Sequence, residues 1–159
     1  MKIVFTHSLR PLPLLISLFT GSRYSHCEFV FSDGKAIYPT PYSARVILTR
    51  KIYSGPNTHI IELDLTPEQE KIIRTWADKQ LGVPYDYNGL TPPGLDKIIK
   101  RKKPHWKHRS SWMCSEFCAY GLELIDWKLF PDDFKKVRPV DLYKKLINLR
   151  NENERICYC

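Results

Sequence analysis

The chain has 159 residues, of which 43% are hydrophobic and 13% aromatic. This length and composition predict one globular domain with a real core and exclude an intrinsically disordered protein. The net charge of +8 is local, because residues 97–109 hold seven basic side chains and no acid, against 18 basic and 17 acidic residues elsewhere. A protein coated with basic residues over a whole face is therefore excluded as well.

The first half of the chain predicts short strands and one short helix. Residues 13–20 form an apolar stretch that predicts a helix ended by Gly21. Ser32-Asp33-Gly34 predicts a hairpin turn between two strands. The expected strands are residues 2–6, 24–31, 35–38, 45–50 and 59–65.

The second half predicts helices. Thr66 suits an N-cap, Pro67 the first turn and Gln69 the closing position of a capping box, and Gly82 ends this helix. Further helices are expected at about 114–125 and from Pro139 through Leu149. We therefore predict an α+β fold, with a single domain over residues 1–150 and a frayed C-terminal tail at 151–159.

His26 is the first candidate for chemistry. It opens an apolar strand, where an imidazole can project from the edge of a sheet toward a helix terminus. Glu28 lies two residues on and hence on the same strand face, where its carboxylate can orient or charge the ring. The alternative is a partly exposed strand histidine beside a surface glutamate. His7, His59, His105 and His108 lack such a context.

Cys114 is the candidate nucleophile, because it stands where a polar loop ends and an amphipathic helix begins. Unpaired helix N–H groups and a nearby imidazolium both lower a thiol pKa, so a lowered pKa is expected here. The alternative is a small buried hydrophobic residue, which also suits Cys118 one turn later. Zinc would need two more ligands, and the remaining cysteines and histidines lack the spacing of a known zinc module.

Three short motifs together point to a family. Ser25-His26-Cys27-Glu28, then Gly82-Val83-Pro84-Tyr85-Asp86, then Cys114-Ser115-Glu116-Phe117 occur in that order. The combination resembles the permuted branch of the NlpC-type papain-like superfamily, which includes the lecithin–retinol acyltransferase-like enzymes and small bacterial and phage members. In this branch the histidine strand precedes the cysteine helix. The resemblance covers residues 11–146 and implies an antiparallel sheet packed against the helix that carries the cysteine.

The resemblance also implies roles for these residues. Cys114 matches the nucleophile, His26 the general base and Tyr85 the tyrosine near the oxyanion. The third polar residue of the family falls near Tyr38, so the third member is Glu28, Tyr38 or absent. The resemblance implies a cysteine hydrolase or acyltransferase that needs no cofactor and no metal.

The implied reaction forms a thioester from an amide or ester, with a murein peptide amide as the first substrate and a lipid or acyl ester as the second. Lys100, Arg101, Lys102 and Lys103 would suit an anionic substrate or surface. A rival hypothesis is a non-enzymatic nucleic-acid-binding protein that uses residues 97–109. We disfavour it, since only Trp106 interrupts the basic run and nucleic-acid binders interleave aromatic residues more densely.

The location of the protein is predicted from cysteines and apolar runs. Five cysteines without a spaced disulfide framework favour a reducing compartment, and we expect the cytoplasm. Residues 12–19 faintly resemble a signal peptide but lack a small-x-small cleavage pattern, which leaves export open. No apolar run approaches eighteen residues, so no membrane-spanning helix is expected.

Overall fold

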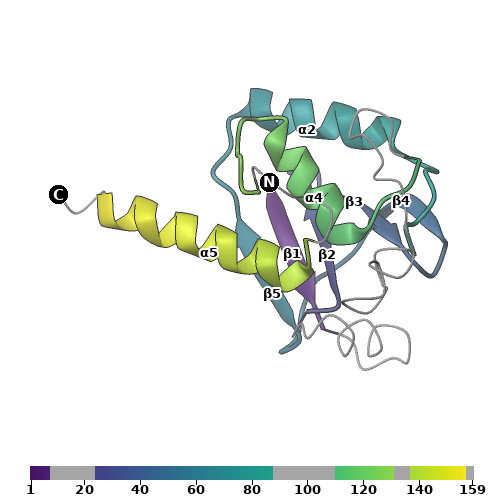
Figure 1. Ribbon diagram of the computed structural model, residues 1–159, viewed down its shortest axis with the longest axis horizontal. Helices are drawn as coiled ribbons and strands as arrows, with labels where there is room; N and C mark the ends of the chain where they lie inside the picture. The colour runs from purple at the N-terminus through teal and green to yellow at the C-terminus, as the bar shows by residue number, and fades with distance from the viewer. Residues whose placement is uncertain (8–23, 88–109, 131–136, 157–159) are drawn as a thin grey trace, which may run out of the picture.

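The computed structural model describes residues 1–7, 24–87, 110–130 and 137–156. These residues form an α+β fold with a five-stranded antiparallel sheet and three helices (Figure 1). The strand order is β4-β3-β2-β1-β5. The strands are β1 (Lys2–Thr6), β2 (His26–Val30), β3 (Lys35–Thr40), β4 (Arg45–Arg50) and β5 (Thr58–Glu62), and the helices are α2 (Pro67–Lys79), α4 (Cys114–Glu123) and α5 (Pro139–Ile156).

Each strand predicted from the sequence is present, and the bounds of β1 and β4 agree with the prediction. The expected helix at 13–20 and the basic run at 97–109 lie outside the described residues. Helix α5 continues to Ile156, past residue 151 at which the sequence predicted that a tail begins. This stretch contains neither glycine nor proline, so the helical hydrogen bonds extend from the preceding turns. In Figure 1 the C-terminal part of α5 runs away from the sheet.

One face of the sheet packs against the helices and holds the main core. Phe5, Phe29 and Ile37 of the sheet are completely buried, as are Phe117 and Leu122 of α4. Helix α4 lies against β2 and β3, as Figure 1 shows. This core fixes the direction of α4 across the strand that carries His26.

Gly121 sets how closely α4 approaches β2. A Cβ atom at this position would lie 2.6 Å from Cε2 of Phe29, which is shorter than side-chain contacts allow. Glycine therefore lets the helix backbone rest directly on the Phe29 ring. The close approach seats the C-terminal half of α4 on β2.

The other face of the sheet carries a smaller core. Val4, Val30, Ala36 and Tyr38 are buried there, and the partly buried Tyr53 packs against them. Glu28 lies on this face because strand residues alternate, whereas Cys27 and Phe29 point toward α4. A glutamate with 1% of its surface exposed is the unusual member of this otherwise apolar layer.

Helix α2 begins at the predicted capping box. The Thr66 hydroxyl accepts a hydrogen bond from the Gln69 N–H, and the Gln69 side chain accepts one from the Thr66 N–H. The helix ends before Gly82, whose φ of +83° favours glycine. Among the described residues, no helix has the length and apolar composition needed to cross a bilayer.

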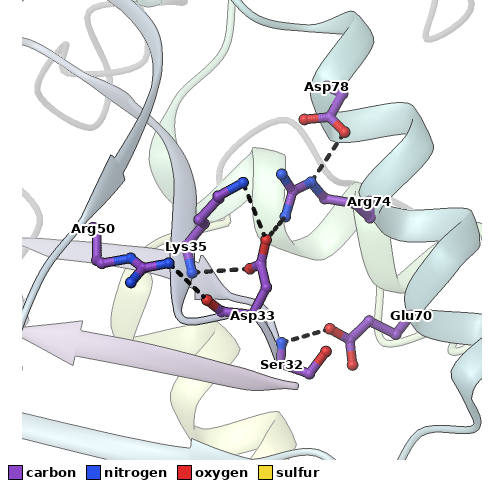
Figure 2. A network of polar contacts seen from close by, with 7 residues as sticks. All are labelled: Ser32, Asp33, Lys35, Arg50, Glu70, Arg74 and Asp78. Carbon is purple, nitrogen blue, oxygen red and sulfur yellow. Dashed lines mark hydrogen bonds and ion pairs between the residues drawn. The ribbon is translucent and has the colours of Figure 1, made fainter.

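A polar network ties α2 to the turn between β2 and β3 (Figure 2). The Glu70 carboxylate accepts a hydrogen bond of 2.7 Å from the Ser32 N–H. Arg74 forms ion pairs with Asp33 at 3.2 Å and with Asp78 at 3.0 Å. The turn end of the hairpin is therefore fastened to the helix above it.

Candidate active site

Cys114 is the first residue of α4, as predicted. The residue before it, Met113, has an extended backbone and occupies the N-cap position. Two hydrogen bonds hold the approach to the helix: Trp112 N–H donates to Pro84 at 3.0 Å, and Asp86 N–H donates to Trp112 at 2.9 Å. The start of α4 is thus paired with the segment that follows Gly82.

His26 lies beside this helix start, although 88 positions separate it from Cys114. It is the first residue of β2, opposite Thr6 of β1. The His26 side chain interacts with the Cys114 thiol through a hydrogen bond and through charge, and both interactions lower the pKa of the thiol. The strand start and the helix start therefore bring an imidazole and a thiol together.

The pKa of Cys114 is nevertheless raised well above its usual value, contrary to the lowering expected from the sequence. The largest cause is a hydrogen bond with the Cys27 thiol, followed by burial, and together they outweigh His26. Cys114 is only 2% exposed and Cys27 is completely buried. Burial disfavours a charged thiolate, so the resting group is a neutral thiol.

Glu28 stands behind His26 on the same strand face. Its Oε2 atom lies 4.0 Å from Nε2 of His26 and 3.2 Å from Nζ of Lys51. Burial raises the pKa of the Glu28 carboxyl, while the charge and hydrogen bond of Lys51 and the hydroxyl of Tyr53 act in the opposite direction. A buried carboxylate with one cationic partner is therefore placed next to the imidazole.

Tyr38 supports the His26 ring from β3. The two rings meet edge to face, with centroids 5.0 Å apart and planes at 69°. Nζ of Lys51 lies 4.0 Å from the centroid of the Tyr38 ring. Burial raises the pKa of the Tyr38 hydroxyl, so this residue contacts the imidazole as a neutral aromatic ring.

Tyr85 lies within range of the thiol's charge, on the segment that follows Gly82. It forms a β-bridge with Trp112, two residues before Cys114, and its N–H donates to Ala44 at 2.8 Å. Burial raises the pKa of Tyr85 well above its usual value, and the charge of a Cys114 thiolate acts in the same direction. The tyrosine thus remains protonated and can donate a hydrogen bond near the sulfur.

A pocket of about 470 Å³ opens onto this group. Its walls come from the end of β1, from the starts of β2 and β5, from β3 and from the segment after β4, and they combine tyrosines with small hydroxyl residues. The lining residues are Thr6, Ser25, His26, Glu28, Tyr38, Thr40, Pro41, Tyr42, Lys51, Ile52, Tyr53, Ser54, Thr58 and Tyr85. Cys114 does not itself line the pocket, but His26, which interacts with its thiol, does, and so does Tyr85.

The four candidate residues from the sequence, Cys114, His26, Glu28 and Tyr85, are brought together, and Tyr38 joins them. Cys118 is completely buried in the core. Residues 97–109, with Lys100 to Lys103, lie outside the described residues, as do Cys157 and Cys159. In the described ranges, no three His, Cys, Asp or Glu side chains are arranged to hold a metal ion.

Sequence reasoning missed Lys51 and Cys27 as neighbours of the site. Lys51 follows the last residue of β4, where nothing in the local pattern indicates that the chain returns over Glu28. Strand alternation places Cys27 on the opposite face from His26, yet Cys114 at the start of α4 interacts with both residues. The position of Cys27 directly after His26 in the sequence was the signal that could have indicated its place near the site.

Comparison with known proteins adds no relative: no protein-family model, curated protein or solved structure matches this chain.

Proposed function

We propose that this protein is a cysteine hydrolase that cleaves an amide or ester bond through a thioester intermediate. The observation that carries the proposal is that the His26 side chain, at the start of β2, acts on the Cys114 thiol, at the start of α4, through its charge and hydrogen bonding and lowers the pKa of the thiol. Glu28 behind the ring supplies the third polar group. A nucleophile, a base within reach of it and a group that orients the base are the parts of this chemistry.

In the first half of the reaction, His26 takes the Sγ proton of Cys114 while sulfur bonds to the substrate carbonyl carbon. Nε2 faces Glu28, so Nδ1 is the nitrogen we assign to this proton. The imidazolium then gives the proton to the leaving amine or alcohol as its bond to carbon breaks. A thioester on Cys114 remains.

In the second half, His26 removes a proton from water as its oxygen attacks the thioester carbon. The carbon–sulfur bond breaks, and the proton returns to the Cys114 sulfur. The products are a carboxylic acid and the free enzyme. An acyl acceptor other than water would give transfer instead of hydrolysis.

The raised pKa of Cys114 favours a general-base route over a preformed thiolate. A neutral buried thiol loses its proton only as the carbon–sulfur bond forms, which demands a base in contact with it. The oxyanion would lie near the free N–H groups of the first turn of α4 and the protonated Tyr85 hydroxyl.

The pocket favours a polar substrate. Five of its lining residues are serine or threonine, and Glu28 and Lys51 add charge. Such walls suit the hydrogen-bonding groups of a peptide better than a long acyl chain. We therefore place a peptide amide first, of the murein type that the family resemblance implies, and an acyl ester second.

The test is a panel of fluorogenic peptide amides, muropeptides and acyl esters, incubated with the wild type and with Cys114→Ser and Cys118→Ala. Mass spectrometry of the quenched protein would detect an acyl adduct. We expect turnover and an adduct on Cys114, both lost in Cys114→Ser and retained in Cys118→Ala. Turnover that survives in Cys114→Ser, or an adduct on another residue, would overturn the assignment.

A further inference from the structure

We propose that Lys51 is a positioning residue of this site, which keeps Glu28 ionised behind His26 and holds the Tyr38 ring against the imidazole. The inference rests on the proposed function only in taking His26 as the base. It adds a residue outside the three family-like motifs.

Lys51 contacts both residues that flank the His26 ring, Glu28 and Tyr38. Its Nζ atom lies 3.4 Å from Oε1 and 3.2 Å from Oε2 of Glu28, so it faces both carboxylate oxygens. The same atom lies 4.0 Å from the centroid of the Tyr38 ring. One ammonium group thus touches the two residues that flank the imidazole.

Glu28 and Lys51 differ strongly in burial, and this difference makes the charge of Glu28 depend on the lysine. The Glu28 side chain is 1% exposed, whereas that of Lys51 is 39% exposed. Lys51 remains in contact with water, while the carboxylate depends on neighbouring protein groups for stabilisation. Removing the lysine would leave a buried carboxylate with no permanent positive charge in contact among the described residues.

The other titratable groups around Glu28 cannot replace that charge. They come from the strand itself, from β3, from the segment after β4 and from α4. These groups are His26, Tyr38 and Tyr53 near the carboxylate, with Cys27 and Cys118 within reach of its charge. Tyrosine and cysteine are neutral at pH 7 when buried, and His26 is cationic only when protonated.

Lys51 would affect the basicity of His26 indirectly, through the ionisation of Glu28. An ionised Glu28 stabilises the imidazolium that forms when His26 takes the thiol proton, whereas a protonated Glu28 does not. Without Lys51, burial would favour the protonated carboxyl. The base would then become weaker although neither it nor the nucleophile had changed.

The first experiment follows the ¹³C signal of the Glu28 carboxyl through a pH titration, with Glu28→Gln to assign it. The proteins are the wild type, Lys51→Met, Lys51→Arg and Lys35→Met. Methionine keeps the apolar stem over Tyr38, and Lys35 is a matched lysine at the other end of the hairpin, with 42% exposure. We expect Glu28 to titrate at higher pH in Lys51→Met alone.

The second experiment measures the alkylation rate of Cys114 by iodoacetamide against pH in the same variants, with Cys114→Ser as the blank. We expect Lys51→Met to react about tenfold more slowly at pH 7, since a general base commonly contributes more than that. Lys51→Arg should restore the rate, and Lys35→Met should match the wild type. A role in folding alone would not give this pattern of rescue.

An unchanged Glu28 titration in Lys51→Met would overturn the inference, as would a shifted titration with no change in thiol reactivity. The outcomes are separable from those of the proposed function. If Lys51 affects both measurements while no substrate is turned over by any variant, the inference about Lys51 stands and the hydrolase assignment fails.

Discussion

The two ends of the β2–β3 hairpin both carry acidic residues with basic partners, but their surroundings differ. At the turn, Asp33 is 43% exposed and Arg74 is 22% exposed. At the strand start, Glu28 is 1% exposed beside His26 and Lys51. The same kinds of side chain are solvated at one end and buried at the other.

This difference reverses the direction of the pKa shifts. Burial is the largest single influence on the pKa of Asp33 and raises it, but the hydrogen bond from the Lys35 N–H and the Arg74 guanidinium together outweigh burial, and the net pKa is lowered. At Glu28, burial dominates over Lys51, and the net pKa is raised. A pKa that burial raises despite a cationic partner means that ionising Glu28 costs free energy in the folded state.

The comparison separates a structural network from a candidate site. The cluster in Figure 2 fastens the turn to α2, and several partners share each charge. The cluster at the strand start lines a pocket and leaves one histidine between a thiol and a carboxylate. We therefore expect substitutions in the turn cluster to change the free energy of unfolding slightly, and substitutions in the cluster around His26 to change catalytic activity.

The largest expected effect is that of His26→Ala. Loss of the base should lower kcat/KM by about 100- to 10,000-fold, the range that general-base catalysis contributes. The matched control is His59→Ala on β5, because His59 also stacks edge to face on tyrosine rings but lies outside the pocket lining. The measurement is kcat/KM with the best substrate from the panel, alongside thermal unfolding.

Equal losses of activity in the two histidine variants, each with unchanged melting temperature, would remove the distinction on which the site rests. A His26→Ala protein with full activity would move the base to another residue. Either result would mean that His26 at the start of β2 has no special role in catalysis, so the two ends of the hairpin would no longer differ in function.

An intermediate effect is expected for Glu28→Gln, and it depends on pH. Because the pKa of Glu28 is raised in the folded state, the folded protein binds more protons than the unfolded one above pH 4.5. The free energy of unfolding should therefore fall as pH rises from 4.5 through the folded-state pKa. Glu28→Gln removes this dependence, so the variant should gain stability relative to wild type between pH 4 and pH 8.

Denaturant unfolding at several pH values measures this difference. The same variant should also lose activity, by about tenfold, because a neutral amide stabilises the imidazolium less than a carboxylate does. A stability difference that stays constant with pH would mean that Glu28 behaves like an exposed carboxyl. The contrast between the two ends of the hairpin would then disappear.

The sequence predicted the parts of the site that local signals define. The strand that opens at His26, the helix start at Cys114 and the capping box at Thr66 each depend on a few neighbouring residues. The pKa of Cys114 was predicted in the wrong direction, because it depends on the Cys27 contact and on burial. Lys51 could not be found, since its contact with Glu28 spans 23 positions and arises only when the chain folds back after β4.

The smallest expected effect is that of Asp33→Asn at the turn. The folded-state pKa of Asp33 is lowered, so its contribution to stability is present above the unfolded pKa of about 3.9 and is lost as pH falls. This sign is opposite to that of Glu28. Asparagine can still accept the 2.9 Å hydrogen bond from the Lys35 N–H, so the variant removes mainly the charge.

Because the ion pair of Asp33 with Arg74 is exposed to solvent, we expect Asp33→Asn to lower the free energy of unfolding by less than about 1 kcal/mol at pH 7. The loss should be smaller in high salt, and activity should be unchanged. Denaturant unfolding at low and high salt, together with kcat/KM, provides the check. A loss above about 2 kcal/mol, or a tenfold drop in activity, would show that the turn end carries a buried or functional charge and that exposure does not distinguish the two clusters.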